Sequence, residues 1–129
     1  MKYSRFEELP VWKDAIELAV RTFALTAKSW FRGHSGTRNQ LENAVVSISN
    51  NIAEGFERGT TKETINFIYI SRGSAGESRS MFCFLVRLPE LVDFKSEISD
   101  LRSRVESISR QLRAWRMRFR TARFAARAI

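Results

Sequence analysis

The residues best suited to do chemistry in this sequence are arginines, crowded into its last part. Residues 102–129 contain nine arginines and a single acid, Glu106, whereas basic and acidic residues balance in residues 1–101. The whole net charge of +8 therefore lies in that segment. Guanidinium groups bind phosphates in a bidentate manner and stack on bases. The nine arginines are Arg102, Arg104, Arg110, Arg113, Arg116, Arg118, Arg120, Arg123 and Arg127.

Five of these arginines repeat at intervals of three and four and so predict one stripe about 21 Å long on a helix. They are Arg113, Arg116, Arg120, Arg123 and Arg127. The stripe predicts a polyanionic partner, with nucleic acid first and an acidic protein or a membrane surface second. A solvated face that pairs with acids of a neighbouring subunit would have the same pattern. A membrane-surface helix would share the charge, but an apolar seam explains the apolar residues better.

Catalytic and metal chemistry find little support in the residue types. The chain has one histidine, His34, and one cysteine, Cys83, so one chain cannot form a disulfide or a Cys/His zinc site. His34 lies in a Gly-His-Ser-Gly turn, and Cys83 lies among apolar residues, where a buried, inert thiol is expected. Carboxylate pairs such as Glu54 and Glu57 are typical of a solvated face. We expect no enzyme, no cofactor and no metal.

An unusual motif, Asn-Asn-Ile-Ala-Glu-Gly-Phe-Glu-Arg-Gly, occupies residues 50–59. Asn and Gly both lower helix propensity, so a specific requirement must place them there. One interpretation is structural: Asn51 and Glu54 satisfy polar groups across a helix interface, Gly55 allows close approach, and Glu54 pairs with Arg58. The other is a ligand site.

A second motif, Ser-Arg-Gly-Ser-Ala-Gly-Glu-Ser, spans residues 71–78 and includes Gly73, Ser74 and Glu77. A phosphate-binding loop needs a preceding strand, and this stretch lies in the middle of a helical pattern. Its small residues favour close helix packing. Residues 55–62 resemble a Walker loop only superficially, because the spacing is wrong and no strand precedes them.

Four segments with helical periodicity must position these residues. The first runs from Pro10 to about Phe31, the second from a cap at Ser35 or Thr37 to Arg58, and the third from a capping box at Thr60 to Pro89. For the first helix we expect one apolar face, with further apolar residues on other sides and hence a second buried surface. That face is Trp12, Ala15, Ile16, Ala19 and Phe23, and the residues on other sides are Val11, Leu18 and Leu25.

The fourth segment, from about Lys95 to Arg127, carries apolar residues at unbroken intervals of three and four. At 1.5 Å per residue this helix is roughly 50 Å long and overhangs the second helix, which is about 30 Å long. A monomer would leave Trp115, Phe119 and Phe124 in water, so we expect an oligomer. The seam is Ile98, Leu101, Val105, Ile108, Leu112, Trp115, Phe119, Ala122 and Ala126.

Short connections between four helices predict an all-α, antiparallel up-down four-helix bundle. We expect residues 1–129 to form one domain, in which residues 102–129 are an Arg-rich extension of the fourth helix. Hydrophobic residues make up 43% of the chain, which is enough for a core, and no apolar run is long enough to span a bilayer. The first residues lack an apolar stretch after their positive charges, so we expect no signal peptide and a soluble, cytoplasmic protein without membrane contact.

Three strings of residues resemble one family: Phe-x-x-Leu-x-Val-Trp-x-x-Ala at residues 6–15, residues 40–58 around Asn51-Ile-Ala-Glu-Gly55, and residues 67–77 with Gly73, Ser74 and Glu77. They resemble the bacterial four-helix-bundle proteins encoded in intervening sequences of 23S ribosomal RNA genes. That family is similar in fold to the accessory variability determinant of diversity-generating retroelements. The resemblance implies a homopentameric barrel, no catalytic centre and a role in binding nucleic acid. In the retroelement branch the pentamer is a partner of a reverse transcriptase.

The sequence departs from the family pattern at Glu42-Asn43, where an arginine is usual, and at Gly76, where a larger residue is usual. The Arg-rich fourth helix is expected to supply a contact that the missing arginine makes in relatives. Two functions follow. One is an oligomeric, non-enzymatic protein that binds RNA or single-stranded DNA, and the other is a protein-interaction adaptor such as a reverse-transcriptase accessory protein.

Overall fold

The computed structural model describes the backbone of residues 3–128 and the side chains of residues 3–119. Four long helices dominate: α1 (Pro10–Thr26), α3 (Ser35–Glu57), α4 (Thr61–Leu85) and α5 (Lys95–Ala128). Three short elements join them: η1 (Phe6–Glu8), α2 (Ser29–Arg32) and η2 (Pro89–Phe94). No strand occurs in residues 3–128. The all-helical prediction is confirmed.

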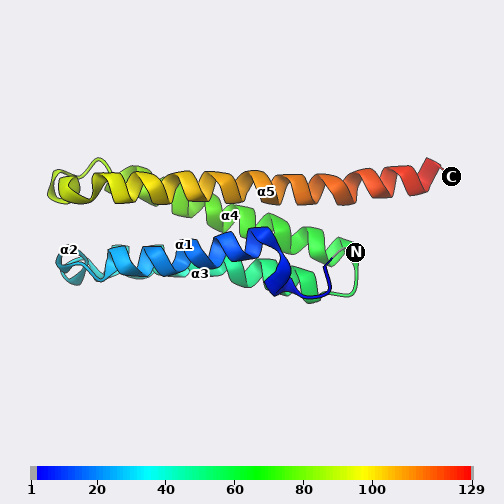
Figure 1. Ribbon diagram of the computed structural model, residues 1–129, viewed down its shortest axis with the longest axis horizontal. Helices are drawn as coiled ribbons and strands as arrows, with labels where there is room; N and C mark the ends of the chain where they lie inside the picture. The colour runs from blue at the N-terminus through cyan, green and yellow to red at the C-terminus, as the bar shows by residue number, and fades with distance from the viewer. Residues whose placement is uncertain (1–2, 129) are drawn as a thin grey trace.

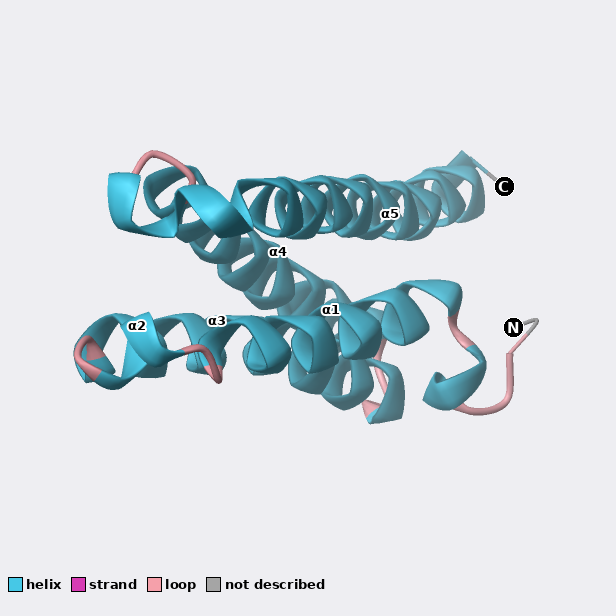
Figure 2. Ribbon diagram, turned by 60° about the vertical axis from the view of Figure 1, so that its left-hand side comes forward, coloured by secondary structure: helices cyan, strands magenta, loops and turns pink. Residues whose placement is uncertain are grey.

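The long helices run alternately up and down, as the colour gradient of Figure 1 shows. Helix α1 packs against α3 and α5, and α4 packs against the same two helices from the other side. Helix α4 crosses obliquely between its neighbours, which is clearest in Figure 2. The C-terminal end of α5 extends past the rest of the bundle. The expected antiparallel order and the overhang of the last helix are both present.

The helix ends follow local chemistry. Thr60 caps α4: its hydroxyl accepts the Glu63 backbone N–H at 3.2 Å and donates to the Glu63 carboxylate at 3.0 Å. The predicted cap at Thr60 is confirmed, whereas the reciprocal bond of a capping box, from the Thr60 backbone N–H to the Glu63 carboxylate, is replaced by the bond between the two side chains. Helix α4 ends at Leu85, before the predicted Pro89. The cap predicted at Ser35 or Thr37 is wrong, because His34 occupies the cap position of α3 without a side-chain cap bond.

The first predicted helix is interrupted. Helix α1 ends at Thr26, Lys28 is extended, and α2 begins at Ser29. In a continuous helix Phe31 would lie opposite the buried Val11, because residues advance about 100° each. The break instead turns the Phe31 ring into the core, where it is fully buried. The predicted single helix to Phe31 is therefore wrong.

The buried face of α1 also differs from the prediction. The core contains Val11, Leu18 and Leu25, which the sequence pattern assigns to other sides, whereas Phe23 is exposed. The apolar repeat of this buried face is hard to recognise in the sequence because one of its positions is polar. Thr22 lies on the core face, is fully buried, and donates its hydroxyl to the Leu18 carbonyl at 2.7 Å. That bond inside its own helix lets a hydroxyl occupy the core.

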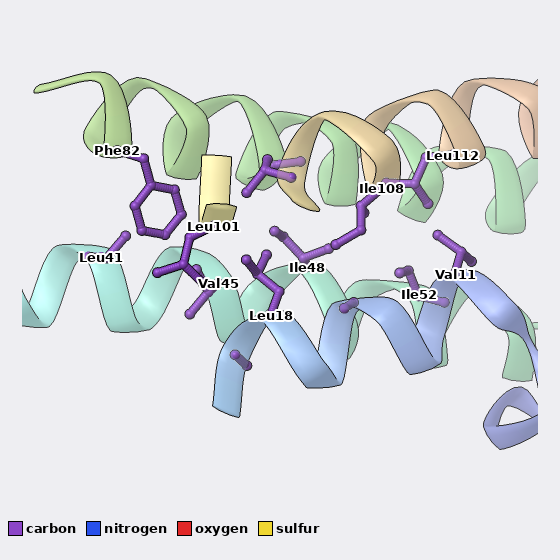
Figure 3. Close-up of a cluster of buried hydrophobic side chains, with 14 of the residues drawn as sticks. Val11, Leu18, Leu41, Val45, Ile48, Ile52, Phe82, Leu101, Ile108 and Leu112 are labelled. Atoms are coloured by element: carbon purple, nitrogen blue, oxygen red, sulfur yellow. The ribbon is translucent and has the colours of Figure 1, made fainter. Parts of the chain in front are cut away.

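The seam of α5 is buried against its own bundle from Ile98 to Trp115. Figure 3 shows Leu101, Ile108 and Leu112 reaching toward side chains of α1 and α3. Trp115 is only 9% exposed, and Phe119 packs partly buried beside it with 6.0 Å between ring centroids. The expectation that a monomer leaves both aromatic rings in water is therefore wrong. The side chains of Ala122, Phe124 and Ala126 lie outside the described residues.

Candidate functional site

The arginines of α5 do not form one surface. Arg104, Gln111 and Arg118 are seven residues apart and share the flank that faces α1, where the Gln111 amide donates to Asp14 at 2.8 Å. Arg110 points to solvent. Arg102 and Arg116 lie on the opposite flank, which faces α4. Arg120, Arg123 and Arg127 lie outside the residues whose side chains are described. Of the predicted stripe, the structure therefore places Arg113 and Arg116.

Several described arginines already have partners within the protomer. Arg104 pairs with Asp100 at 2.9 Å, and Arg102 lies half-buried with a guanidinium nitrogen 4.0 Å from the Cys83 sulfur. Arg116 donates to the Tyr69 hydroxyl at 2.8 Å. By contrast Arg110, Arg113 and Arg118 are exposed and make no ion pair among the described residues. These three keep their charge available for a ligand.

Residues 102–129, which we call the tail, contain one acid, and it already has an ion-pair partner. Glu106 lies 3.6 Å from Arg79 of α4, with both side chains partly exposed. It therefore neutralises a cation of α4 and none of the α5 arginines. The flank between α4 and α5, which we call the arginine flank, carries five cations: Arg72, Arg79, Arg102, Arg113 and Arg116.

Contacts along this flank follow one antiparallel register. Cys83 contacts Arg102, Arg79 contacts Glu106 and Tyr69 contacts Arg116. Moving back along α4 by a given number of residues therefore corresponds to moving forward along α5 by the same number. The same register places Arg72 opposite Arg113. Neither of these two has an ion-pair partner among the described side chains.

The Asn-Ile-Ala-Glu-Gly motif lies at the α3–α4 contact and is satisfied internally. Asn51 donates to the carbonyl and the hydroxyl of Ser47, at 2.8 and 2.9 Å, and the Ser47 hydroxyl is 2.9 Å from that of Ser74. Glu54 pairs with Arg58 at 2.6 Å. The structural interpretation is thus favoured, although Asn51 and Glu54 bond within α3 and Ser47 makes the contact across the interface.

Gly55 is required by its neighbours. An added Cβ would lie 2.9 Å from the Cβ of Phe67, and the Thr64 hydroxyl donates to the Gly55 carbonyl at 2.8 Å. The close approach predicted for this glycine is confirmed. Arg58 extends from the same end of α3 over the Phe67 ring, 4.9 Å from its centroid, and reaches Glu63 at 3.4 Å.

The second motif divides between two faces of α4. Ser71, Ala75 and Ser78 are buried, and the Ser71 hydroxyl donates to the Ile48 carbonyl of α3 at 2.9 Å, so close packing is confirmed. Glu77 accepts a 3.4 Å hydrogen bond from Gln40 at the rim. Gly73 is exposed on the far side, where an added Cβ would have no neighbouring atom within 4 Å.

The two places where the sequence departs from the family pattern, at Glu42 and at Gly76, lie in different surroundings. Glu42 accepts a hydrogen bond from the Thr26 hydroxyl at 2.6 Å and pairs with Arg38 at 3.1 Å, so it ties the end of α1 to α3. Gly76 is exposed in open space. Cys83 is only partly buried, so the expectation of a buried thiol is wrong.

Two further properties concern the described residues alone. They contain no group of three or more His, Cys, Asp or Glu side chains arranged to hold a metal ion. None of the helices, over the part of the chain that the structure describes, is both long and apolar enough to cross a membrane.

The fold and the site define a helical-bundle protein with a basic, overhanging last helix. The sequence model of the family described as 23S rRNA-intervening sequence protein matches residues 7–114. The chain belongs to this family, as its motifs in α1, α3 and α4 predict. No curated protein sequence matches the chain significantly.

Proposed function

We propose that this chain is a non-enzymatic, oligomeric protein that binds RNA or single-stranded DNA through arginines of α5. One observation carries the proposal: Arg110, Arg113 and Arg118 are exposed and lack ion-pair partners in the described part of the chain. Exposed, unpaired guanidinium groups on one helix attract phosphates and release counterions when they bind. The tail offers only Glu106 to oppose them, and Arg79 occupies it.

A titration tests this proposal. Fluorescence anisotropy with a labelled RNA single strand, measured at about 50 and about 200 mM salt, should show binding that falls steeply as salt rises. A variant with Arg110, Arg113 and Arg118 all changed to Gln should bind more weakly and lower the slope of log affinity against log salt by about two, at roughly 0.7 per lost contact.

A matched variant separates local from overall charge. Changing Arg21, Arg32 and Arg87 to Gln removes the same charge from α1, from α2 and from the loop after α4. This control should leave most of the binding intact. If the two variants lose equal affinity, binding depends on net charge alone. If the parent shows no salt-dependent binding, the proposal fails.

Oligomerisation is part of the proposal and rests on a different surface. Ile16, Val20 and Phe23 recur on one side of α1, beside the partly buried Trp12, and Val20 and Phe23 are 61% and 44% exposed. A contiguous apolar stripe of this kind is typical of an interaction site. The pentamer implied by the resemblance predicts five protomer masses in light scattering. Changing Val20 and Phe23 to Glu should yield smaller particles that keep their helical circular dichroism.

The same stripe favours a second candidate function, an adaptor that docks a protein such as a reverse transcriptase. In that case α1 is covered by the partner, and nucleic acid is incidental. Purification of the tagged chain from its native host, with and without nuclease treatment, discriminates the two functions. A reverse transcriptase retained after nuclease and lost in the Val20 and Phe23 variant would support the adaptor.

A further inference from the structure

Tyr69 stands out on the arginine flank because it is an aromatic residue exposed among cations. It lies on α4, and 49% of its surface is exposed. Arg116 of α5 lies over its ring, with 5.3 Å from the guanidinium carbon to the ring centroid, and donates to its hydroxyl at 2.8 Å. A second nitrogen of Arg116 lies 3.7 Å from the Met117 sulfur. The guanidinium is therefore held in place on the ring.

The hydrogen-bonding capacity of Arg116 is not used up. Its Nε is buried and lacks a hydrogen-bond partner among the described residues. A cation placed over an aromatic ring is attracted by the ring quadrupole. The pair thus presents a fixed, flat, positively charged surface, and each terminal nitrogen of Arg116 keeps one N–H that no described residue accepts.

Two further cations flank this pair. The register of α4 and α5 places Arg72 and Arg113 opposite each other, next to Tyr69 and Arg116 along the flank. Arg113 is exposed, Arg72 is half-buried, and neither forms an ion pair with a described residue. The nearest acid of α5, Glu106, pairs with Arg79 further along. An aromatic surface therefore has two available phosphate-binding groups beside it.

The surface of α4 next to Tyr69 is open. Gly73 and Gly76 lie four and seven residues after Tyr69, on the same face, and a Cβ added to either would have no neighbouring atom within 4 Å. Helical side chains lean toward the N-terminus, so a side chain at position 73 would lean over Tyr69 and one at position 76 over the next turn of the same face. Glycines there leave the ring accessible.

We propose that Tyr69, Arg72, Arg113 and Arg116 bind an unpaired nucleobase and its neighbouring phosphates, so that the preferred ligand is single-stranded nucleic acid. This inference rests on the proposed function and specifies its ligand. A free base stacks on the tyrosine ring and on the guanidinium plane, and such stacking contributes about 1–3 kcal/mol per base. In a duplex the bases are already stacked, so only the phosphate contacts remain.

The test compares three probes of equal phosphate number: a short labelled RNA single strand, an RNA duplex of half its length, and an abasic single strand of the same length. Two variants of Tyr69 are needed. Tyr69→Leu removes the ring, whereas Tyr69→Phe keeps the ring and removes only the hydroxyl that accepts from Arg116. Phe84→Leu is the matched control, because Phe84 is an exposed aromatic residue elsewhere on α4.

We expect Tyr69→Leu to weaken single-strand binding about 5- to 150-fold, the range that corresponds to the loss of one stacked base. Tyr69→Phe should bind within about threefold of the parent, since the stacking ring remains. Duplex and abasic probes should not distinguish Tyr69→Leu from the parent, and Phe84→Leu should bind like the parent.

Two results would overturn the inference while leaving the proposed function in place. An equal loss on single strand and duplex would mean that Tyr69 acts only by holding Arg116. Unchanged single-strand binding by Tyr69→Leu, together with weaker binding by the triple Gln variant of Arg110, Arg113 and Arg118, would mean that phosphates alone are contacted. Failure of the parent to bind any probe would instead overturn the proposed function and this inference with it.

Discussion

The two flanks of α4 differ in how their polar groups are satisfied. Toward α3, the buried hydrogen bonds join neutral groups: Ser71 bonds the Ile48 carbonyl, and Thr64 bonds the Gly55 carbonyl. Toward α5, contacts involve arginines, and Arg72 lacks an ion-pair partner among the described residues. The flank with the unusual sequence motif is therefore the internally satisfied one. Residues that look functional in the sequence can serve packing alone, as those of the motif do. An exposed charge without an ion-pair partner has no such structural role.

The largest expected effect tests whether α5 belongs to its own protomer. Trp115→Ala removes a 9% exposed aromatic side chain from the end of the described seam and should lower the free energy of unfolding by about 3–5 kcal/mol. Urea denaturation measures it, and the exposed neighbour Arg113→Ala should change stability by less than about 0.5 kcal/mol. A small loss for Trp115→Ala, accompanied by dissociation in light scattering, would show that the seam is intermolecular.

The next largest expected change in stability concerns the flank of α4 that faces α3. Gly55→Ala brings a Cβ to within 2.9 Å of the Phe67 Cβ, so the helices must separate slightly, at a cost of about 1–3 kcal/mol. Thermal denaturation followed by circular dichroism gives the change. Gly73→Ala is the matched control: its Cβ meets nothing, and replacing a mid-helix glycine should raise stability by up to about 1 kcal/mol. Equal destabilisation by both would contradict the comparison.

A smaller effect concerns one hydrogen bond between α3 and α4. Ser71→Ala removes the hydroxyl that donates to the Ile48 carbonyl at 2.9 Å, and should cost about 0.5–1.5 kcal/mol. Ser80 lies exposed on the same helix, so Ser80→Ala should stay within about 0.5 kcal/mol of the parent. Chemical denaturation of both variants decides the matter, and indistinguishable midpoints would argue against this bond.

The smallest expected change in stability concerns the flank of α4 that faces α5. Glu106→Gln breaks a 3.6 Å ion pair with Arg79 between partly exposed groups, which should change stability by at most about 1 kcal/mol. It also frees Arg79 and removes the one acid of the tail, so the proposed RNA binding should tighten and its salt slope should steepen. Weaker RNA binding by this variant would contradict the role given to the arginine flank.

Much of the architecture is readable from local patterns. Apolar spacing alone predicts α5 from Lys95, and the Thr60 and Glu63 pair predicts the start of α4. The buried face of α1 is not readable in this way, because Thr22 interrupts its apolar heptad. A polar residue in a core is acceptable only when a bond satisfies it, and the Leu18 carbonyl that does so becomes visible only in the folded helix.

The candidate site, too, could be predicted only in part from the sequence. The charge asymmetry of residues 102–129 is plain in the sequence, and it singles out α5. Sequence reasoning missed Tyr69, Arg72 and Arg79, because they belong to α4 and approach the α5 arginines only through the antiparallel register. A tyrosine in the middle of a helical segment, followed four and seven residues later by glycines on the same face, is the signal that could have drawn attention to Tyr69.

The sequence by itself determined the helical segments, the asymmetry of charge and the family, since propensity, periodicity and motif strings are local properties of the chain. The tertiary structure decided which face of α1 is buried, where Phe31 packs and which arginines have partners. Periodicity states which residues share a face of a helix, but not which face meets which neighbour. That choice depends on the register between helices, and packing along their whole length sets the register.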